Sequence, residues 1–356
     1  MTAAPVLAGP VEIIGTGLLG TSVALACRRA GLEVLLSDLD ADHVRTATGL
    51  GAGRPRRPED RPQLVVVAVP PDHLGEVIAS ALSAGDGVVT DVGSIKEIPA
   101  LAVAGLPGAE RYAGSHPMAG NERSGPLAAS ATLFDGRPWA ITPHAASSPD
   151  AVELVRALAE VCGGVVAEMT PAEHDRAVAR ISHVPHLMAA LTAGRLAGAP
   201  AEHLALSGQG VRDVTRVAGG DPDLYSQIVG GNATAVAELL GELRAEIDTL
   251  LAALTEGDRT SIEAILRRGN AGTTAIPAKH GGPIRPMASV FVAVPDAPGG
   301  LARLFADAGE IGVNIEDVRI DHDPGRQVGI VEVVVDAAAA DGLVAALGSR
   351  GWASHS

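Results

Sequence analysis

Cysteine and the aromatic residues are scarce in this chain. Only two of its 356 residues are cysteines, Cys27 and Cys162, and phenylalanine, tryptophan and tyrosine together make up 2%. Two cysteines in apolar, helix-like segments exclude a disulfide framework and a thiolate metal cluster, so we expect two buried structural thiols and no metal site. With so few aromatic rings, the cores have to be built from Ala, Val, Leu and Ile.

Positive charge is also in short supply. The chain has 27 Lys and Arg against 42 Asp and Glu, a formal net charge of −15. Such a surface repels phosphate, which argues against nucleic acids and anionic membranes as partners. No run reaches the roughly 18 apolar residues of a membrane span, and no signal segment opens the chain. We therefore expect a soluble, cytoplasmic protein.

The chain does have length and apolar content, 47% over 356 residues, enough for two or three domains with their own cores. Its first motif follows a short apolar strand at Val11 and reads Gly15-x-Gly17-x-x-Gly20 before a helix. Gly15 permits the tight turn, Gly17 lets the backbone approach a pyrophosphate, and Gly20 lets helix pack on strand. The N–H groups at the start of the helix, at Leu18 and Leu19, then face the anion. The motif predicts a dinucleotide-binding domain.

Strand ends supply the other candidate cofactor residues. A strand from Glu33 to Ser37 ends at Asp38, whose carboxylate can accept the ribose hydroxyls and repels a 2′-phosphate, which favours NAD over NADP. The continuous apolar strand Leu64 to Val69 is typical of a parallel sheet buried on both faces. The carboxyl edge of such a sheet is where ligands bind, so we add the residues that end this strand and the next one, Gly87 to Thr90: Val69, Pro70 and Asp91. The basic stretch Arg54 to Pro62 is expected to be a solvated connection.

A small-residue stretch from Gly114 to Gly120 carries one imidazole, His116. A histidine takes or gives a proton near neutrality, and small neighbours let a substrate approach. We expect a loop that carries a general base, although an incidental histidine in a turn remains open from this stretch alone. Ser94, in Asp91-x-Gly93-Ser94-x-Lys96, follows the neighbouring strand. A strand Arg137 to Thr142, a helix Pro149 to Val161 and a strand Gly164 to Glu168 complete a domain over residues 1–169.

The next region, residues 170–280, is predicted to be all-helical. It begins with Thr170-Pro171-Ala-Glu173, an N-cap with proline at the first helical position. Ser182 and His186 are four residues apart and share a helix face, with His183 beside them and a proline that bends or restarts the helix. Farther on, Arg216 is suited to bidentate capture of a carboxylate, although spacing alone favours an ion pair with Asp213 or at an interface. A long amphipathic helix, Ala233 to Leu254, favours a homodimer.

The stretch from Ala278 to Pro286 has two glycines and two prolines, and we place a linker at residues 281–287. After it, the helical pattern gives way to alternating strands and helices. Residues 288–356 are predicted to form a ferredoxin-like βαββαβ module. Its expected elements are strand Ser289 to Val294, helix Pro298 to Gly309, strands Val313 to Ile320 and Val328 to Val335, helix Ala337 to Leu347, and a short last strand. The turn from Asp296 to Gly300 has the backbone N–H groups to bind a small ligand, which indicates a regulatory module, with a purely structural cap as the alternative.

Five motifs follow one another along the chain: the glycine motif, Asp91-x-Gly93-Ser94-x-Lys96, His116-Pro-Met-Ala-Gly120, Ser182-His-x-Pro-His186 and Thr215-Arg216. Through these motifs, in this order, the chain resembles the prephenate/arogenate dehydrogenases of tyrosine biosynthesis with a C-terminal ACT domain. The resemblance covers nearly the whole chain. It implies that a 4-hydroxycyclohexadiene gives a hydride to NAD and loses its ring carboxylate as CO2. It further implies that His116 is the base, that Ser94 orients the hydroxyl or the base, and that Arg216 holds a substrate carboxylate beside Ser182, His183 and His186.

The sequence departs from the family pattern at two places that bear on substrate choice. Asn121 stands where Thr or Ser is common, and Tyr225 where tryptophan is common. The amide of Asn121 favours prephenate, whereas the adjacent Glu122 suits the ammonium of arogenate, which stays an alternative. The ACT resemblance implies an amino-acid effector, most plausibly L-tyrosine, bound near Asp296, Gly299, Asn314 and Ile315.

Two other functions are weighed against this one. A β-hydroxyacid dehydrogenase shares the domain order but usually relies on a helical lysine, and Lys279 is the only lysine in the helical region, at its very end. A non-catalytic amino-acid sensor would need no proton acceptor, yet His116 is accompanied by serines, a second histidine and an arginine. Both alternatives are therefore ranked below the dehydrogenase.

Overall fold

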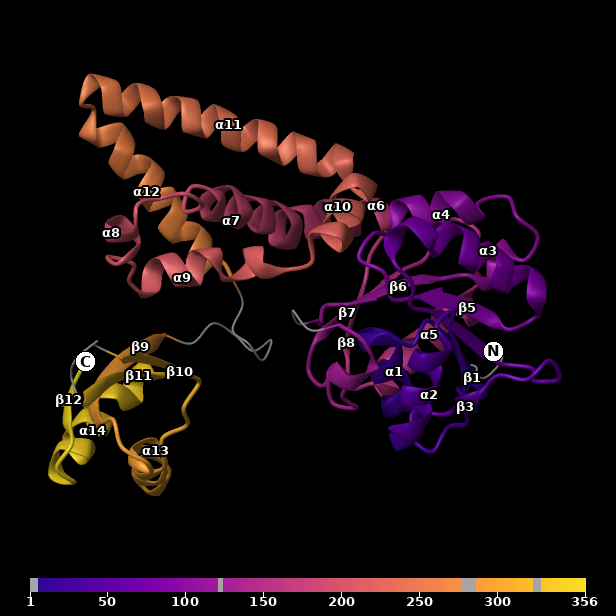
Figure 1. Ribbon diagram of the computed structural model, residues 1–356, viewed down its shortest axis with the longest axis horizontal. Helices are drawn as coiled ribbons and strands as arrows, with labels where there is room; N and C mark the ends of the chain where they lie inside the picture. The colour runs from indigo at the N-terminus through magenta and orange to yellow at the C-terminus, as the bar shows by residue number, and fades with distance from the viewer. Residues whose placement is uncertain (1–5, 121–123, 277–285, 323–327) are drawn as a thin grey trace. The chain divides into compact units, whose positions relative to one another are not determined.

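The computed structural model describes residues 6–120, 124–276, 286–322 and 328–356 of the chain. It folds into two units, Met1–Ala252 and Ala253–Ser356. Figure 1 colours the chain from indigo in the first unit to yellow at the end of the second. Asn121 and most of the predicted linker lie outside the described residues.

The first unit begins with a five-stranded parallel sheet of order β3-β2-β1-β4-β5. Its strands are β1 (Val11–Ile14), β2 (Val34–Ser37), β3 (Arg54–Pro55), β4 (Leu64–Val67) and β5 (Val88–Asp91). Helices α1 (Leu18–Arg29), α2 (Ala41–Gly49) and α3 (Leu74–Ala84) connect them. In β4, Leu64 and Val66 pack into the core that α1 joins, whereas Val65 and Val67 pack into the core that α3 joins. The predicted Rossmann-type sheet, buried on both faces, is confirmed.

Two boundaries in this sheet differ from the prediction. The stretch expected to be only a connection contains β3, whose Arg54 and Pro55 pair with Leu35 and Leu36 of β2. Ion pairs of Arg54 with Glu33 at 2.8 Å and Asp60 at 2.6 Å accompany this pairing. Strand β4 ends at Val67, before Val69, since the prolines that follow have no N–H for a ladder and open a 3-10 turn, Pro71–His73. Both predicted cysteines are free and buried, as expected.

His116 lies on a strand and not in the loop that the sequence suggested. Strand β6 (Gly114–Pro117) pairs antiparallel with β7 (Pro138–Thr142), which pairs parallel with β8 (Val165–Glu168). The pairing sets His116 opposite Ala140. Gly114 makes the close approach possible, because a Cβ there would lie 2.7 Å from Thr142 Oγ1. Helix α4 (Glu97–Val103) precedes these strands in the chain, and α5 (Pro149–Val161) connects β7 to β8.

The rest of the first unit is helical, as predicted. Thr170 and Glu173 form a complete capping box at the start of α6 (Pro171–Val178). A π-helical turn, Ala179–His183, leads into α7 (Val184–Gly194). Then follow α8 (Ala201–Leu204), α9 (Gln209–Thr215), a 3-10 turn (Arg216–Gly219), α10 (Pro222–Gly231) and α11 (Ala233–Glu256). A small core of Ala179, Val184, Ala235 and Val236 joins the start of α7 to the start of α11.

The second unit contains α12 (Arg259–Thr274) and an antiparallel sheet of order β10-β11-β9-β12. Its strands and helices run β9 (Met287–Pro295), α13 (Gly300–Ile311), β10 (Asp317–His322), β11 (Val328–Asp336), α14 (Ala337–Ser349) and β12 (Ala353–His355). Alternate residues of β9 and β11, among them Val292 and Val333, are buried with Leu304 and Leu343 of the two helices α13 and α14.

Two predicted boundaries of this module are wrong. Strand β10 begins at Asp317 and not at Val313, because Gly312 caps α13 with a φ of +80° and the chain needs a turn before it can pair. Asn314 and Ile315 therefore lie in the connection, where Asn314 donates to Glu316 at 2.7 Å. Met287, assigned to the linker, is the first residue of β9. None of the helices in the described ranges is long and apolar enough to span a bilayer.

Candidate active site

The glycine turn between β1 and α1 has the shape that a dinucleotide needs. Gly15 has a φ of +98°, and a Cβ there would lie 2.3 Å from the carbonyl oxygen of Ala68. A Cβ on Gly20 would lie 1.9 Å from the carbonyl oxygen of Gly15, so helix and turn touch only because this residue is glycine. The Cβ position of Gly17, by contrast, faces open space. No side chain caps the helix that starts at Leu18, so its first N–H groups are left to an anion, and the pyrophosphate of NAD fits here.

Asp38 stands at the end of β2, beside this turn. Its Oδ2 accepts hydrogen bonds from the backbone N of Thr16 at 2.6 Å and from the hydroxyl at 2.9 Å. Partial burial raises the pKa of Asp38, but the hydrogen bonds from Thr16 and Asp40 outweigh it and hold the pKa below its usual value. The carboxylate therefore keeps the charge with which it can accept ribose hydroxyls. His43, which the sequence analysis did not single out, approaches it at 3.9 Å.

Asp91, predicted to face the cofactor, is engaged inside the protein. Its carboxylate pairs with the buried ammonium of Lys96 and accepts hydrogen bonds from the hydroxyl of Tyr112 at 2.9 Å and the backbone N of Gly93 at 3.0 Å. Burial lowers the pKa of Lys96 against the attraction of Asp91, and burial together with Asp91 raises the pKa of Tyr112. The side chains of Asp91, Lys96 and Tyr112 thus form a buried cluster next to the loop that carries Ser94.

His116 is half-buried and bonded to a second histidine. Its Nδ1 lies 2.9 Å from Nε2 of His174, in α6, and the two rings meet edge to face. His174 Nδ1 lies 2.8 Å from Oδ1 of Asp175. Burial lowers the pKa of both histidines, and the pKa of His116 falls well below its usual value because Lys96 and the other histidines add to the effect. His116 is therefore neutral near pH 7, the state in which an imidazole accepts a proton.

Asp175 links this pair to two other elements. Its Oδ1 accepts from the backbone N of Lys96 at 2.8 Å and its Oδ2 from that of Glu97 at 2.9 Å, at the start of α4. Asn232 donates to the carbonyl oxygen of Asp175 at 2.7 Å and lies 3.2 Å from Nδ1 of His183. Burial lowers the pKa of His183 to about 4. The sequence analysis missed His174, Asp175 and Asn232, although a His-Asp pair just after a capping box was visible.

The π-helical turn decides which residues of the Ser182-to-His186 motif face inward. His183 and His186 are buried, whereas Ser182 is exposed. His186 stacks on Tyr225 with ring centroids 3.4 Å apart and planes 8° from parallel. Gly220 makes room for the stack, since a Cβ there would lie 3.1 Å from both rings. The Nδ1 atom of His186 is buried and has no hydrogen-bond partner among the described atoms.

Two predicted site residues are not bonded to His116. Ser94 is half-buried and Arg216 is exposed, and within the described ranges no hydrogen bond joins either of them to His116. Arg216 begins the 3-10 turn that packs on α7, the helix that carries His186. In the same ranges no three His, Cys, Asp or Glu side chains are arranged to hold a metal ion.

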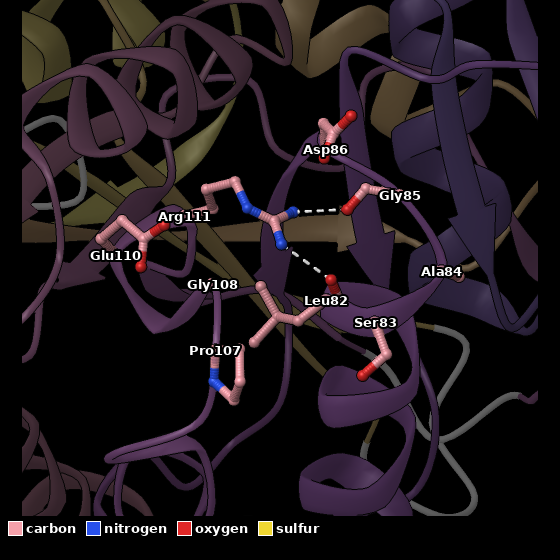
Figure 2. Close-up of a pocket in the computed structure, with 9 residues that line it drawn as sticks. All are labelled: Leu82, Ser83, Ala84, Gly85, Asp86, Pro107, Gly108, Glu110 and Arg111. Carbon is pink, nitrogen blue, oxygen red and sulfur yellow. Dashed lines mark hydrogen bonds between the residues drawn. The ribbon is translucent and has the colours of Figure 1, made fainter.

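A separate pocket of about 580 Å³ lies near the other end of β5 (Figure 2). The guanidinium of Arg111 donates to the carbonyl oxygens of Leu82 and Gly85, both at 2.7 Å, and of Gly87 at 2.9 Å. Its donors are therefore used to close the end of α3. Because ligands of parallel sheets bind at the carboxyl ends of the strands, this pocket is not part of the site.

Comparisons with known proteins agree with this geometry. Residues 23–168 match the family model of the prephenate dehydrogenase nucleotide-binding domain, and residues 170–268 match that of the dimerization domain. The chain is 34% identical over 361 residues to the probable prephenate dehydrogenase NovF of Streptomyces niveus, which covers 97% of this chain and 99% of that protein.

Two solved structures are similar over about three quarters of the chain. Prephenate dehydrogenase from A. aeolicus, in complex with hydroxyphenyl propionate and NAD+, is 26% identical with a TM-score of 0.68, over 74% of this chain and 96% of that one. Arogenate dehydrogenase from Synechocystis is 25% identical with a TM-score of 0.64, over 74% and 98%.

Proposed function

The chain belongs to the prephenate dehydrogenase family, and from this premise we propose that it oxidises prephenate with NAD to 4-hydroxyphenylpyruvate and CO2. One observation carries the proposal. A neutral histidine, His116, is held by a buried hydrogen-bond chain in the domain that has the dinucleotide turn. Oxidation of an alcohol needs such a base at the hydroxyl as the hydride leaves.

The cofactor is NAD, which accepts the hydride from the hydroxyl-bearing carbon. The N–H groups at the start of α1 bind its pyrophosphate, and the open space at Gly17 lets that group come close. Asp38 accepts the hydroxyls of a ribose and repels a 2′-phosphate. Val69 and Pro70, which follow β4, border the same edge of the sheet. Asp91, at the end of β5, holds this edge through its hydrogen bond from Tyr112.

The reaction requires a proton acceptor and a group that orients the substrate. His116 takes the hydroxyl proton as the hydride departs, the bond between ring and carboxylate breaks to give CO2, and the electrons of that bond complete the aromatic ring. The ring oxygen, left as a phenolate, takes the proton back from His116 to give the phenol of the product. Ser94 orients the hydroxyl. Arg216 holds a substrate carboxylate, and this contact positions the substrate, because an arginine that stabilised the ring carboxylate would oppose its departure. The stacked rings of His186 and Tyr225 form a flat wall for the substrate ring, with the buried His183 as a further polar contact.

We assign one role in this reaction, or in its regulation, to each part of the chain. Residues 1–169 bind NAD, residues 170–280 bind substrate and form the homodimer, and residues 287–356, which begin with β9, are a ferredoxin-like ACT module after the linker. The match to a dimerization domain supports the second assignment. The strand order β10-β11-β9-β12 supports the third. L-tyrosine is the effector, bound near Asp296, Gly299, Asn314 and Ile315, where a φ of +90° at Gly299 opens the turn before α13. The protein acts in the cytoplasm.

Arogenate is the alternative substrate, favoured by the similarity to the Synechocystis arogenate dehydrogenase. The two reactions differ in product, since prephenate gives 4-hydroxyphenylpyruvate and arogenate gives tyrosine. Mass spectrometry of the products from each substrate, with NADH and CO2 counted in the same reaction, tests the proposal. Equal amounts of NADH, CO2 and 4-hydroxyphenylpyruvate are expected. NADH without CO2 would indicate an ordinary hydroxyacid dehydrogenase and overturn it.

A further inference from the structure

We propose that His174 and Asp175 are positioning residues that fix the tautomer of His116, with the proton on Nδ1 and a free lone pair on Nε2. The inference rests on the proposed function in one respect: it assumes that His116 is the base of the reaction. It adds which nitrogen receives the proton and which charge balances it. The juxtaposition that carries it is the continuous chain from His116 through His174 to the start of α4.

The carboxylate of Asp175 has three partners among the described residues: the backbone N–H groups of Lys96 and Glu97 and the ring of His174. The backbone N–H groups of Lys96 and Glu97 can only donate, and they point at its two oxygens from 2.8 and 2.9 Å. With both oxygens facing N–H donors, the carboxylate acts as the acceptor in this cluster. The 2.8 Å contact with His174 therefore requires the proton to be on Nδ1 of His174.

The tautomer of His116 follows from that of His174. Burial lowers the pKa of His174, so the ring carries one proton, which is already assigned to Nδ1. Its Nε2 is then an acceptor. A distance of 2.9 Å between Nε2 of His174 and Nδ1 of His116 needs one hydrogen, which has to come from His116. The ring of His116 is neutral as well, so its Nε2 is unprotonated and available to a substrate hydroxyl.

The charges around the pair explain why this arrangement assists catalysis. When His116 accepts a proton, a cation forms in a site that already holds the ammonium of Lys96. That ammonium is paired with Asp91, and His183 is neutral with its pKa lowered to about 4. Asp175 is thus the carboxylate left to balance the new charge, and it acts through the ring of His174. Asn232 holds the backbone of Asp175 in place from the end of α10.

The first experiment observes the tautomer directly and needs no turnover. Full-length protein with ¹⁵N-labelled histidine is saturated with NAD, and the ring nitrogens of His116 are assigned by comparison with His116→Asn. The expected spectrum shows a protonated Nδ1 and an unprotonated Nε2 at pH 7.5. A proton on Nε2 would overturn the proposal. Because no substrate is present, this result stands whether or not the protein oxidises prephenate.

The second experiment separates positioning from mere packing. His174→Gln keeps an acceptor for the N–H of His116 but cannot pass charge to Asp175, whereas His174→Leu removes the acceptor. We expect kcat to fall roughly 10- to 100-fold in His174→Leu. This loss is smaller than the roughly 10²- to 10⁴-fold that a general base contributes, because His116 itself is kept. KM and NAD affinity should stay within about two-fold, and His174→Gln should recover much of the loss. The acid limb of the kcat profile should move to lower pH in His174→Leu, because the imidazolium of His116 loses its hydrogen-bond acceptor.

His144→Leu is the matched control. His144 is a partly buried histidine of the same unit whose Nε2 lies 3.0 Å from the carbonyl oxygen of Ala109 and whose ring packs against Tyr112, so its loss costs comparable contacts and leaves the bond between His116 and His174 in place. It should keep the kcat and the pH profile of the wild type. A His174→Leu protein that binds NAD and has unchanged kcat and pH profile would overturn the proposal. If that variant does not fold, the tautomer of the wild-type protein decides the question.

Discussion

Nδ1 of His116 lies 2.9 Å from Nε2 of His174, a contact that joins strand β6 of the nucleotide-binding part to the first helix of the helical part. In the proposed mechanism a residue of α6 therefore orients the base, while the cofactor turn lies between β1 and α1. We expect a change in the packing of α6 to alter the base as well, and neither part to work without the other.

The lowered pKa of His116 predicts an unusual pH dependence. The active form of the base is the unprotonated one, and burial with nearby positive charge holds the pKa of His116 well below the 6.5 of a free histidine. The active form thus persists as the pH falls below 6.5. Initial rates between pH 4.5 and 8 should give a kcat/KM profile whose acid limb lies clearly below 6.5. An acid limb at or above that value would contradict the assignment of the base.

The glycine turn predicts different effects on stability, and a common loss of NAD affinity, for two glycines of one motif. Gly20→Ala places a Cβ 1.9 Å from the carbonyl oxygen of Gly15, so we expect a loss of stability of about 1–3 kcal/mol and weaker NAD binding. Gly17→Ala fills open space, so the unfolding temperature should stay near that of the wild type while NAD affinity falls at least about ten-fold.

Gly49→Ala is the control for both variants, since a Cβ at this α2 position meets nothing within 4 Å. Its thermal unfolding and its NAD titration should match the wild type. Gly17→Ala protein with unchanged NAD affinity would show that the pyrophosphate does not bind at this turn.

Asp38 predicts the choice between the two nicotinamide cofactors. Asp38→Asn removes the charge and keeps an acceptor for Thr16, so the turn should survive. We expect kcat/KM for NAD to fall about ten-fold and the ratio of NADP to NAD activity to rise, because the repulsion of the 2′-phosphate is lost. Steady-state kinetics with both cofactors measures this. An unchanged ratio would mean that Asp38 does not face the ribose.

The proposed ACT module predicts feedback inhibition that depends on residues 287–356. Full-length protein should lose activity as L-tyrosine is added, whereas a chain that ends at Arg285 should keep its activity and lose the inhibition. Asn314→Ala, which removes the hydrogen bond to Glu316 in the connection before β10, should weaken inhibition without lowering the uninhibited rate. Equal inhibition of the full and the shortened chain would place the tyrosine site elsewhere.

Features with short-range causes could be predicted from the sequence. The glycine turn, the capping box at Thr170 and the doubly buried β4 each follow from residues within a few positions of one another. The strand that carries His116 could not be foreseen, because its small, proline-containing sequence looks like a loop and its pairing partner, β7, lies more than twenty residues away. Ladder hydrogen bonds with a distant segment outweighed the local preference.

The hydrogen-bond chain behind the base was missed for the same reason. His174 is 58 positions from His116, and Asn232 is 57 positions from Asp175. The helical spacing of the motif pointed to His183 and His186. The π-helical turn changes the number of residues per turn there, so the residues do not lie on the faces that a regular α-helix would give them. Ser182 is exposed as a result, while His186 stacks on Tyr225, a pair that no local pattern indicates.

The most direct test of the account is the formation of NADH, followed by absorbance, when NAD and prephenate are added to the wild type and to His116→Asn. Arogenate is assayed in parallel. The account predicts turnover with prephenate and a loss of roughly 10²- to 10⁴-fold in kcat for His116→Asn, with NAD binding retained. Turnover at the wild-type rate in that variant, or no NADH from either substrate in protein that binds NAD, would contradict it.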